Sequence, residues 1–85
     1  MAYRISIKPA ASKDLDILPG KEVQRILFHI SQLQYEPRPV GIQKLGGEEG
    51  YRIRSGNYRV LFEIDDKAKT ISIYRIKHRK DVYRK

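Results

Sequence analysis

The stretch that decides the fold lies in the second half of the chain and runs Tyr51-Arg52-Ile53-Arg54-Ser55-Gly56-Asn57-Tyr58-Arg59-Val60-Leu61-Phe62-Glu63-Ile64. Its apolar and polar side chains alternate on both sides of a central segment, 55–57, that is rich in turn-forming residues. Alternation of this kind is typical of strands, because successive side chains point to opposite faces of a sheet. The stretch therefore predicts an antiparallel hairpin.

The two faces of this hairpin have different chemistry. One face carries the apolar set that we expect to lie under helices: Tyr51, Ile53, Tyr58, Val60, Phe62 and Ile64. The other face carries Arg52, Arg54 and Arg59. Like charges on neighbouring strands repel each other, so three guanidinium groups on one face predict an anionic ligand. The alternative is that each is an ordinary solvated arginine of a basic protein.

The segments around the hairpin complete an α+β fold. Residues 3–8 alternate as a strand up to Pro9, which can begin a short helix reaching about Leu18. Apolar residues with helical spacing over 23–33 predict a longer helix, and residues 36–50 predict an irregular connection. Residues 70–76 predict a last strand, in which the alternation changes after Ile73 and indicates a central strand or a bulge.

The predicted order is β-α-α-β-β-β, with two N-terminal helices packed on one face of a small, mostly antiparallel four-stranded sheet. A chain of 85 residues is too short for two hydrophobic cores, so residues 1–85 should form a single domain. The absence of cysteine excludes disulfides and thiolate sites and favours a reducing cytoplasm. No apolar segment is long enough for a membrane span or a signal sequence.

The formal net charge of +8 is concentrated in one part of the chain. Residues 1–50 have a net charge of +1, whereas residues 51–85 have a net charge of +7. The hairpin and the terminal run Lys77-His78-Arg79-Lys80-Asp81-Val82-Tyr83 carry most of this excess. A basic surface of this kind indicates a polyanionic partner, either a nucleic acid or an acidic protein segment.

The same residues carry a resemblance to a known family. The pattern Lys44-Leu45-Gly46-Gly47, Tyr51-Arg52-Ile53-Arg54, Gly56, Tyr58-Arg59-Val60 and His78-Arg79-Lys80-Asp81-Val82-Tyr83 resembles the RelE/ParE superfamily of bacterial and archaeal toxins. It is most similar to the RelE branch, the ribosome-dependent mRNA interferases. This resemblance implies cleavage of mRNA in the ribosomal A site and neutralisation by a cognate, RelB-like antitoxin.

The resemblance also implies roles for individual side chains. Arg54, Arg59, His78 and Tyr83 match the catalytic set, and Arg52, Lys77, Arg79 and Lys80 match positions that bind RNA. Tyr83 would orient the 2′-hydroxyl or stack on a base. The position of the general acid varies within the family, so Lys77 and Arg79 remain alternatives to His78. His78 could also be an ordinary surface histidine, and Tyr83 a C-terminal core anchor.

The expected chemistry needs neither a metal nor a cofactor. RNA supplies its own nucleophile, the 2′-hydroxyl, and arginine side chains can neutralise the charge that develops on the phosphate. Among the candidates only His78 has an ordinary pKa near neutrality, about 6.5, which favours it as the general acid. Histidine and carboxylate residues lack the spacing of a metal site.

Two other functions are compatible with the sequence. A ParE-like toxin would have the same fold but inhibit DNA gyrase, and that branch lacks the basic catalytic set. A basic RNA- or DNA-binding module without catalysis is the second alternative.

Overall fold

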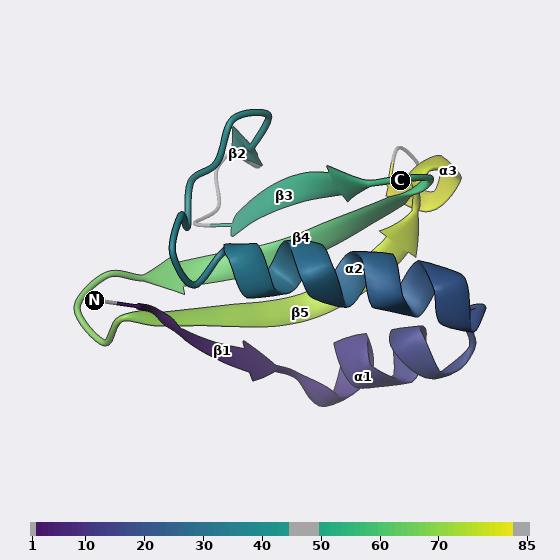
Figure 1. Ribbon diagram of the computed structural model, residues 1–85, viewed down its shortest axis with the longest axis horizontal. Helices are drawn as coiled ribbons and strands as arrows, with labels where there is room; N and C mark the ends of the chain where they lie inside the picture. The colour runs from purple at the N-terminus through teal and green to yellow at the C-terminus, as the bar shows by residue number, and fades with distance from the viewer. Residues whose placement is uncertain (1, 45–49, 83–85) are drawn as a thin grey trace.

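The computed structural model describes residues 2–44 and 50–82 (Figure 1). The helices are α1 (Pro9–Asp16), α2 (Gly20–Gln32) and α3 (Arg79–Val82), and the strands are β1 (Arg4–Ile7), β2 (Gln43–Lys44), β3 (Gly50–Ser55), β4 (Tyr58–Asp65) and β5 (Thr70–His78). The Leu45-Gly46-Gly47 part of the predicted motif and the predicted site residue Tyr83 lie outside the described residues.

The strands form one mixed sheet in the order β1-β5-β4-β3-β2. β1 is parallel to β5, and the other neighbours are antiparallel. The predicted α+β order is confirmed, but the predicted count of four strands is wrong. The additional strand, β2, pairs with β3 from within the connection that we expected to be irregular. Two residues are too few to show a periodicity, so only the pairing reveals this strand.

The first helix begins at the proline that the sequence predicts, and a second proline directly precedes the next helix. Pro9 is the first residue of α1, and Pro19 precedes the first turn of α2. Figure 1 shows α2 running across one face of the sheet, with α1 on the same side beside β1 and β5. Ile26 and Ile30 of α2 are buried against the sheet, together with Leu33 just after the helix. No described helix is long and apolar enough to span a membrane.

The hydrophobic core lies between the helices and the apolar face of the hairpin. All six hairpin residues that we expected there belong to the core cluster or pack against it. The strand pairing puts Arg54 directly opposite Arg59, and Arg52 directly opposite Leu61, on the face away from the helices. Leu61 is buried yet lies outside the core cluster, as expected for an apolar residue among the stems of long basic side chains.

A bulge in β5 explains the change of alternation that the sequence shows. Leu61 pairs with Arg75 and Phe62 pairs with Ile73, so Tyr74 is an extra residue between them. The bulge turns the following side chains over, and Ile71, Ile73 and Ile76 all reach the core. It also sets the direction of every later side chain of β5, which decides the composition of the site.

Candidate nucleic-acid interface

Three cationic side chains form a row across β3, β4 and β5, one residue from the end of the strands at the β3–β4 turn, on the face away from the helices. Arg54 of β3 lies opposite Arg59 of β4, and Arg59 lies opposite Lys77 of β5. We call these three residues the basic row. Directly opposed side chains have Cβ atoms about 5 Å apart, and like charges at that separation destabilise the sheet. The row is therefore an arrangement that an anion would stabilise.

None of the described carboxylates neutralises the basic row. In residues 2–44 and 50–82, the ion pairs join Arg25 to Glu22, Arg38 to Asp66 and Arg75 to Asp14. Arg54 is exposed, while Arg59 is half-buried and donates from Nη1 to the carbonyl oxygen of Tyr58 at 3.2 Å. The positive charge of the row is thus presented to the solvent side of the sheet.

A shallow hollow adjoins the row at the β2 side of the sheet. Its volume is about 340 Å³, and it is lined by Gly41, Gln43, Arg52, Ile53, Arg54 and Arg59. Arg52 donates from Nε to the Oε1 atom of Gln43 at 2.6 Å. Guanidinium groups beside a hollow of this size suit a phosphate with part of its nucleotide, because arginine can contact two phosphate oxygens at once.

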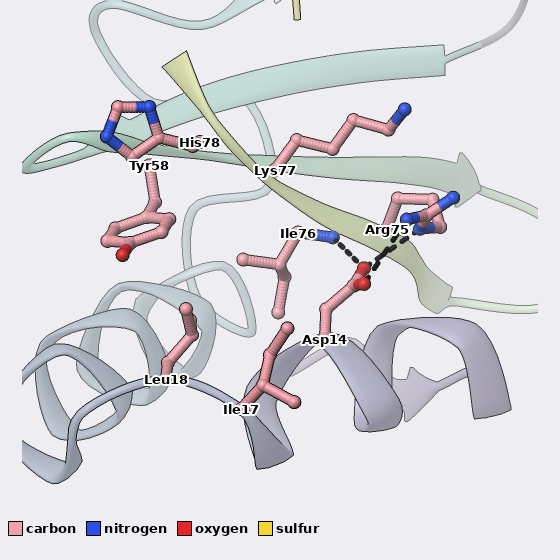
Figure 2. A pocket seen from close by; sticks show the side chains of 8 residues that line it. All are labelled: Asp14, Ile17, Leu18, Tyr58, Arg75, Ile76, Lys77 and His78. Carbon is pink, nitrogen blue, oxygen red and sulfur yellow. Dashed lines mark hydrogen bonds and ion pairs between the residues drawn. The ribbon is translucent and has the colours of Figure 1, made fainter. Parts of the chain in front are cut away.

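The structure does not group His78 with the basic row. Lys77 lies on the row's face, so the next side chain, His78, points to the face of the helices. There it lies opposite Tyr58, with ring centroids 5.3 Å apart in an edge-to-face arrangement. The backbone N–H of Lys80 donates to His78 Nδ1 at 3.2 Å. Figure 2 shows Lys77 extending away from the two rings.

His78 and Tyr58 border a second hollow, beside α1 and the outer edge of β5, and Lys77 of the basic row also lines it (Figure 2). Its volume is about 560 Å³, and Asp14, Ile17 and Leu18 line its other side. Asp14 accepts hydrogen bonds from Arg75 Nε at 2.9 Å and Nη2 at 3.2 Å, and from the backbone N–H of Ile76 at 2.8 Å. Arg75 is thereby held at α1.

The remaining predicted RNA-binding residues lie at the end of the sheet nearest the hairpin turn. Arg79 and Lys80 are exposed at the start of α3. The backbone N–H of Arg79 donates to the carbonyl oxygen of Asn57 at 2.8 Å, which fastens this segment to the β3–β4 turn. Both residues extend the positive charge beyond the basic row.

A second charged cluster lies at the opposite end of the sheet. Asp66 accepts a hydrogen bond from Arg38 Nη2 at 3.0 Å and another from the Tyr3 hydroxyl at 2.6 Å. These bonds, with that of Arg38 the stronger, lower the pKa of Asp66 to about 2. The pKa of Tyr3 is raised, chiefly by its bond to Asp66. The cluster joins the β4–β5 turn to the segment that leads into β2.

The sequence did not indicate that Gln43 contacts Arg52, because the two residues meet only through strand pairing and no local pattern marks Gln43. Lys77 was predicted as an RNA-binding residue, but its position directly opposite Arg59 is evident only from the strand pairing. Among the described residues, no three histidine or acidic side chains are gathered in a way that could hold a metal ion.

Comparisons with known proteins agree with this fold. Residues 5–83 match the model of the family described as the ParE toxin of the type II toxin-antitoxin system, parDE. Toxin RelG of Mycobacterium tuberculosis is 35% identical over 89 aligned residues, which cover 100% of both chains. Toxin RelE3 of Methanocaldococcus jannaschii is 37% identical and covers 84% of both chains.

A solved structure extends the likeness to three dimensions. The crystal structure of the archaeal RelE-RelB complex from Pyrococcus horikoshii contains a chain with a TM-score of 0.83 and 36% identity. The match covers 93% of the present chain and 97% of that one. The chain therefore belongs to the RelE/ParE superfamily of type II toxin–antitoxin toxins.

Proposed function

We propose that this toxin is a ribosome-dependent endoribonuclease, which cleaves mRNA in the A site and so inhibits translation. The observation that carries the proposal is the basic row, Arg54, Arg59 and Lys77, aligned on adjacent strands without a described carboxylate partner. A row of cations on an open sheet face suits a phosphodiester backbone. The relatives with which the chain shares 35–37% identity are RelE and RelG toxins.

The proposed reaction uses the 2′-hydroxyl of the substrate as nucleophile. The 2′-oxygen loses its proton and attacks the adjacent phosphorus, the bond to the 5′-oxygen breaks, and that oxygen gains a proton. The products are a 2′,3′-cyclic phosphate and a 5′-hydroxyl. Arg54 and Arg59 would stabilise the additional negative charge of the pentavalent transition state, since guanidinium groups remain charged and these two lie directly opposite each other on β3 and β4. This mechanism requires no cofactor.

Two neighbouring residues of β5, Lys77 and His78, are candidates for the group that donates a proton to the leaving 5′-oxygen. The sequence favours His78, because imidazole is the commonest general acid in enzymes, whereas the register favours Lys77, which lies directly opposite Arg59. We therefore assign the contact with the scissile phosphate to Lys77. Single-turnover cleavage by Lys77→Met and His78→Gln tests this assignment. A larger rate loss in Lys77→Met supports it, and a larger loss in His78→Gln returns the role to the imidazole.

The remaining roles follow the family pattern. Tyr83 would orient the 2′-hydroxyl or stack on a base, and Arg52, Arg79 and Lys80 would bind the RNA backbone. We further infer a cytoplasmic location and a RelB-like antitoxin with an acidic segment that covers the basic face. The Pyrococcus horikoshii relative was crystallised as a RelE-RelB complex, which supports a partner of this kind.

Primer extension on translating ribosomes tests the proposal. We expect discrete cuts in the A site, unaffected by EDTA and abolished in Arg59→Ala. Arg4→Ala is a matched control, because Arg4 pairs with Thr70, which lies seven residues along β5 from Lys77, roughly 20 Å at the rise of a strand. Intact mRNA together with inhibited DNA supercoiling would instead identify a gyrase inhibitor. RNA binding without cleavage would identify a non-catalytic module.

A further inference from the structure

A neutral side chain holds one of the arginines of the basic face. Gln43 of β2 lies directly opposite Arg52 of β3, and its Oε1 atom accepts the Nε–H of Arg52 at 2.6 Å. A carboxylate at this position would hold the guanidinium equally well but would cancel its charge. An amide oxygen restrains the guanidinium without itself adding a negative charge beside it.

The strand that carries Gln43 is short and lies at the edge of the described sheet, but contacts hold both the strand and the segment before it. It pairs with β3 through Gln43 and Lys44. In the segment before β2, Arg38 binds Asp66 of the β4–β5 turn through both terminal nitrogens, and its guanidinium lies 5.4 Å from the centroid of the Tyr51 ring. These contacts hold the segment before β2 against the sheet, so Gln43 has a defined place beside Arg52.

Both residues line the hollow of about 340 Å³ that adjoins Arg54 and Arg59. A side chain that loses conformational freedom on binding a ligand binds it more weakly. An arginine that is already restrained loses less of this freedom, so it should bind the ligand more tightly. We infer that Gln43 is a positioning residue, which orients Arg52 toward an RNA phosphate at this hollow. The inference rests on the proposed function only in taking RNA as the anion.

A double-mutant cycle measures this coupling without requiring cleavage. The probe is a fluorescein-labelled 2′-O-methyl RNA octanucleotide, which lacks the nucleophilic hydroxyl, and binding is followed by fluorescence anisotropy at low salt. Restraint of one arginine side chain predicts that Gln43→Ala raises Kd by about two- to tenfold. In an Arg52→Ala background, the same substitution should leave Kd unchanged, because there is no guanidinium to orient.

Two further variants sharpen the test. Gln43→Glu should weaken binding more than Gln43→Ala, since the new carboxylate would add a negative charge beside the guanidinium and the RNA phosphate. Gln24→Ala is the matched control, because Gln24 is an exposed glutamine of α2 on the helix side, and its Kd should equal that of the wild type. Thermal midpoints of Gln43→Ala and wild type should coincide, which separates positioning from a structural role.

Two results would overturn the inference. The first is an equal rise in Kd from Gln43→Ala in the wild-type and Arg52→Ala backgrounds, and the second is wild-type binding by Gln43→Ala. Failure of the proposed function gives a different result, because absence of cleavage on ribosomes does not alter the binding cycle. In that case the coupling of Gln43 and Arg52 would stand as a property of RNA binding alone.

Discussion

Replacement of Asp14 should reveal how strongly α1 is fastened to the sheet. β1 pairs with β5 only as far as Ile73, so within residues 2–44 and 50–82 no strand pairs with the outer edge of β5 beyond that point. There the carboxylate of Asp14 accepts the backbone N–H of Ile76 at 2.8 Å, as well as two hydrogen bonds from Arg75. We predict that Asp14→Ala destabilises the fold much more than an ordinary surface substitution.

The expected magnitude follows from the burial of the two partners. The Asp14 side chain is 17% exposed and that of Arg75 is 43% exposed. A hydrogen bond from a backbone N–H to a charged acceptor contributes about 1.5–3 kcal/mol, and a half-exposed ion pair contributes under about 1 kcal/mol. Asp14→Ala should therefore lower the free energy of unfolding by about 2–3 kcal/mol. Asp14→Asn should lower it by about 1 kcal/mol, because the amide oxygen still accepts the N–H.

Thermal and urea unfolding at pH 7, followed by circular dichroism, measure both variants. For a domain of this size, 2–3 kcal/mol corresponds to a fall in Tm of about 10–20 °C. Asp16→Ala is the matched control, because Asp16 is exposed in the same helix and should change Tm little. A loss of less than about 0.5 kcal/mol in Asp14→Ala would refute the argument, since that is the scale of ordinary surface substitutions.

The pH dependence provides an independent check. Burial raises the pKa of Asp14, but the hydrogen bonds from Arg75 and the Ile76 N–H together outweigh it, and the net pKa is lowered. A lowered pKa in the folded state means that the stabilisation is present above the unfolded value, about 3.9, and is lost as the pH falls below it. The difference in stability between wild type and Asp14→Asn should therefore shrink below pH 4.

Three further predictions concern the core, the hairpin turn and the charged cluster. Phe62 is fully buried and stacks on a neighbouring aromatic ring, so Phe62→Ala should lower the free energy of urea unfolding by about 3–5 kcal/mol, and a loss below about 1 kcal/mol would contradict this packing. Gly56 has a φ of +61°, so Gly56→Ala should destabilise by about 1–2 kcal/mol in thermal unfolding, whereas an unchanged Tm would contradict the left-handed turn. Asp66 has a pKa of about 2, held down chiefly by Arg38. Its contribution to stability should therefore be lost as the pH falls from about 4 to 2. Asp66→Asn should remove this part of the pH dependence, and an acid unfolding curve that the substitution leaves unaltered would contradict the pairing.

Local patterns predicted much of the fold. The alternation on either side of Gly56 predicted the hairpin and its core face, and the helical spacing of Ile26 and Ile30 predicted α2. The change of alternation after Ile73 indicated either a central strand or a bulge, and the register shows a bulge there. These features are visible in the sequence because a strand and an amphipathic helix each impose a short, regular period on buried residues.

Features that depend on pairing between distant segments were missed. β2 consists of two exposed residues, and their partner strand begins only at Gly50. His78 was expected beside the arginines, but its direction depends on how many residues the bulge inserts into β5 and on which residue of β4 lies opposite. A change of one residue in that register would exchange the faces of Lys77 and His78.

The sequence by itself determined that the arginines of the hairpin would share one face, because side-chain direction along a strand follows from chain position alone. It also located the excess charge in residues 51–85. Only the tertiary structure decided which groups surround those arginines. Strand pairing set Lys77 opposite Arg59 and Gln43 opposite Arg52, and such long-range register depends on contacts that form only when the whole sheet is assembled.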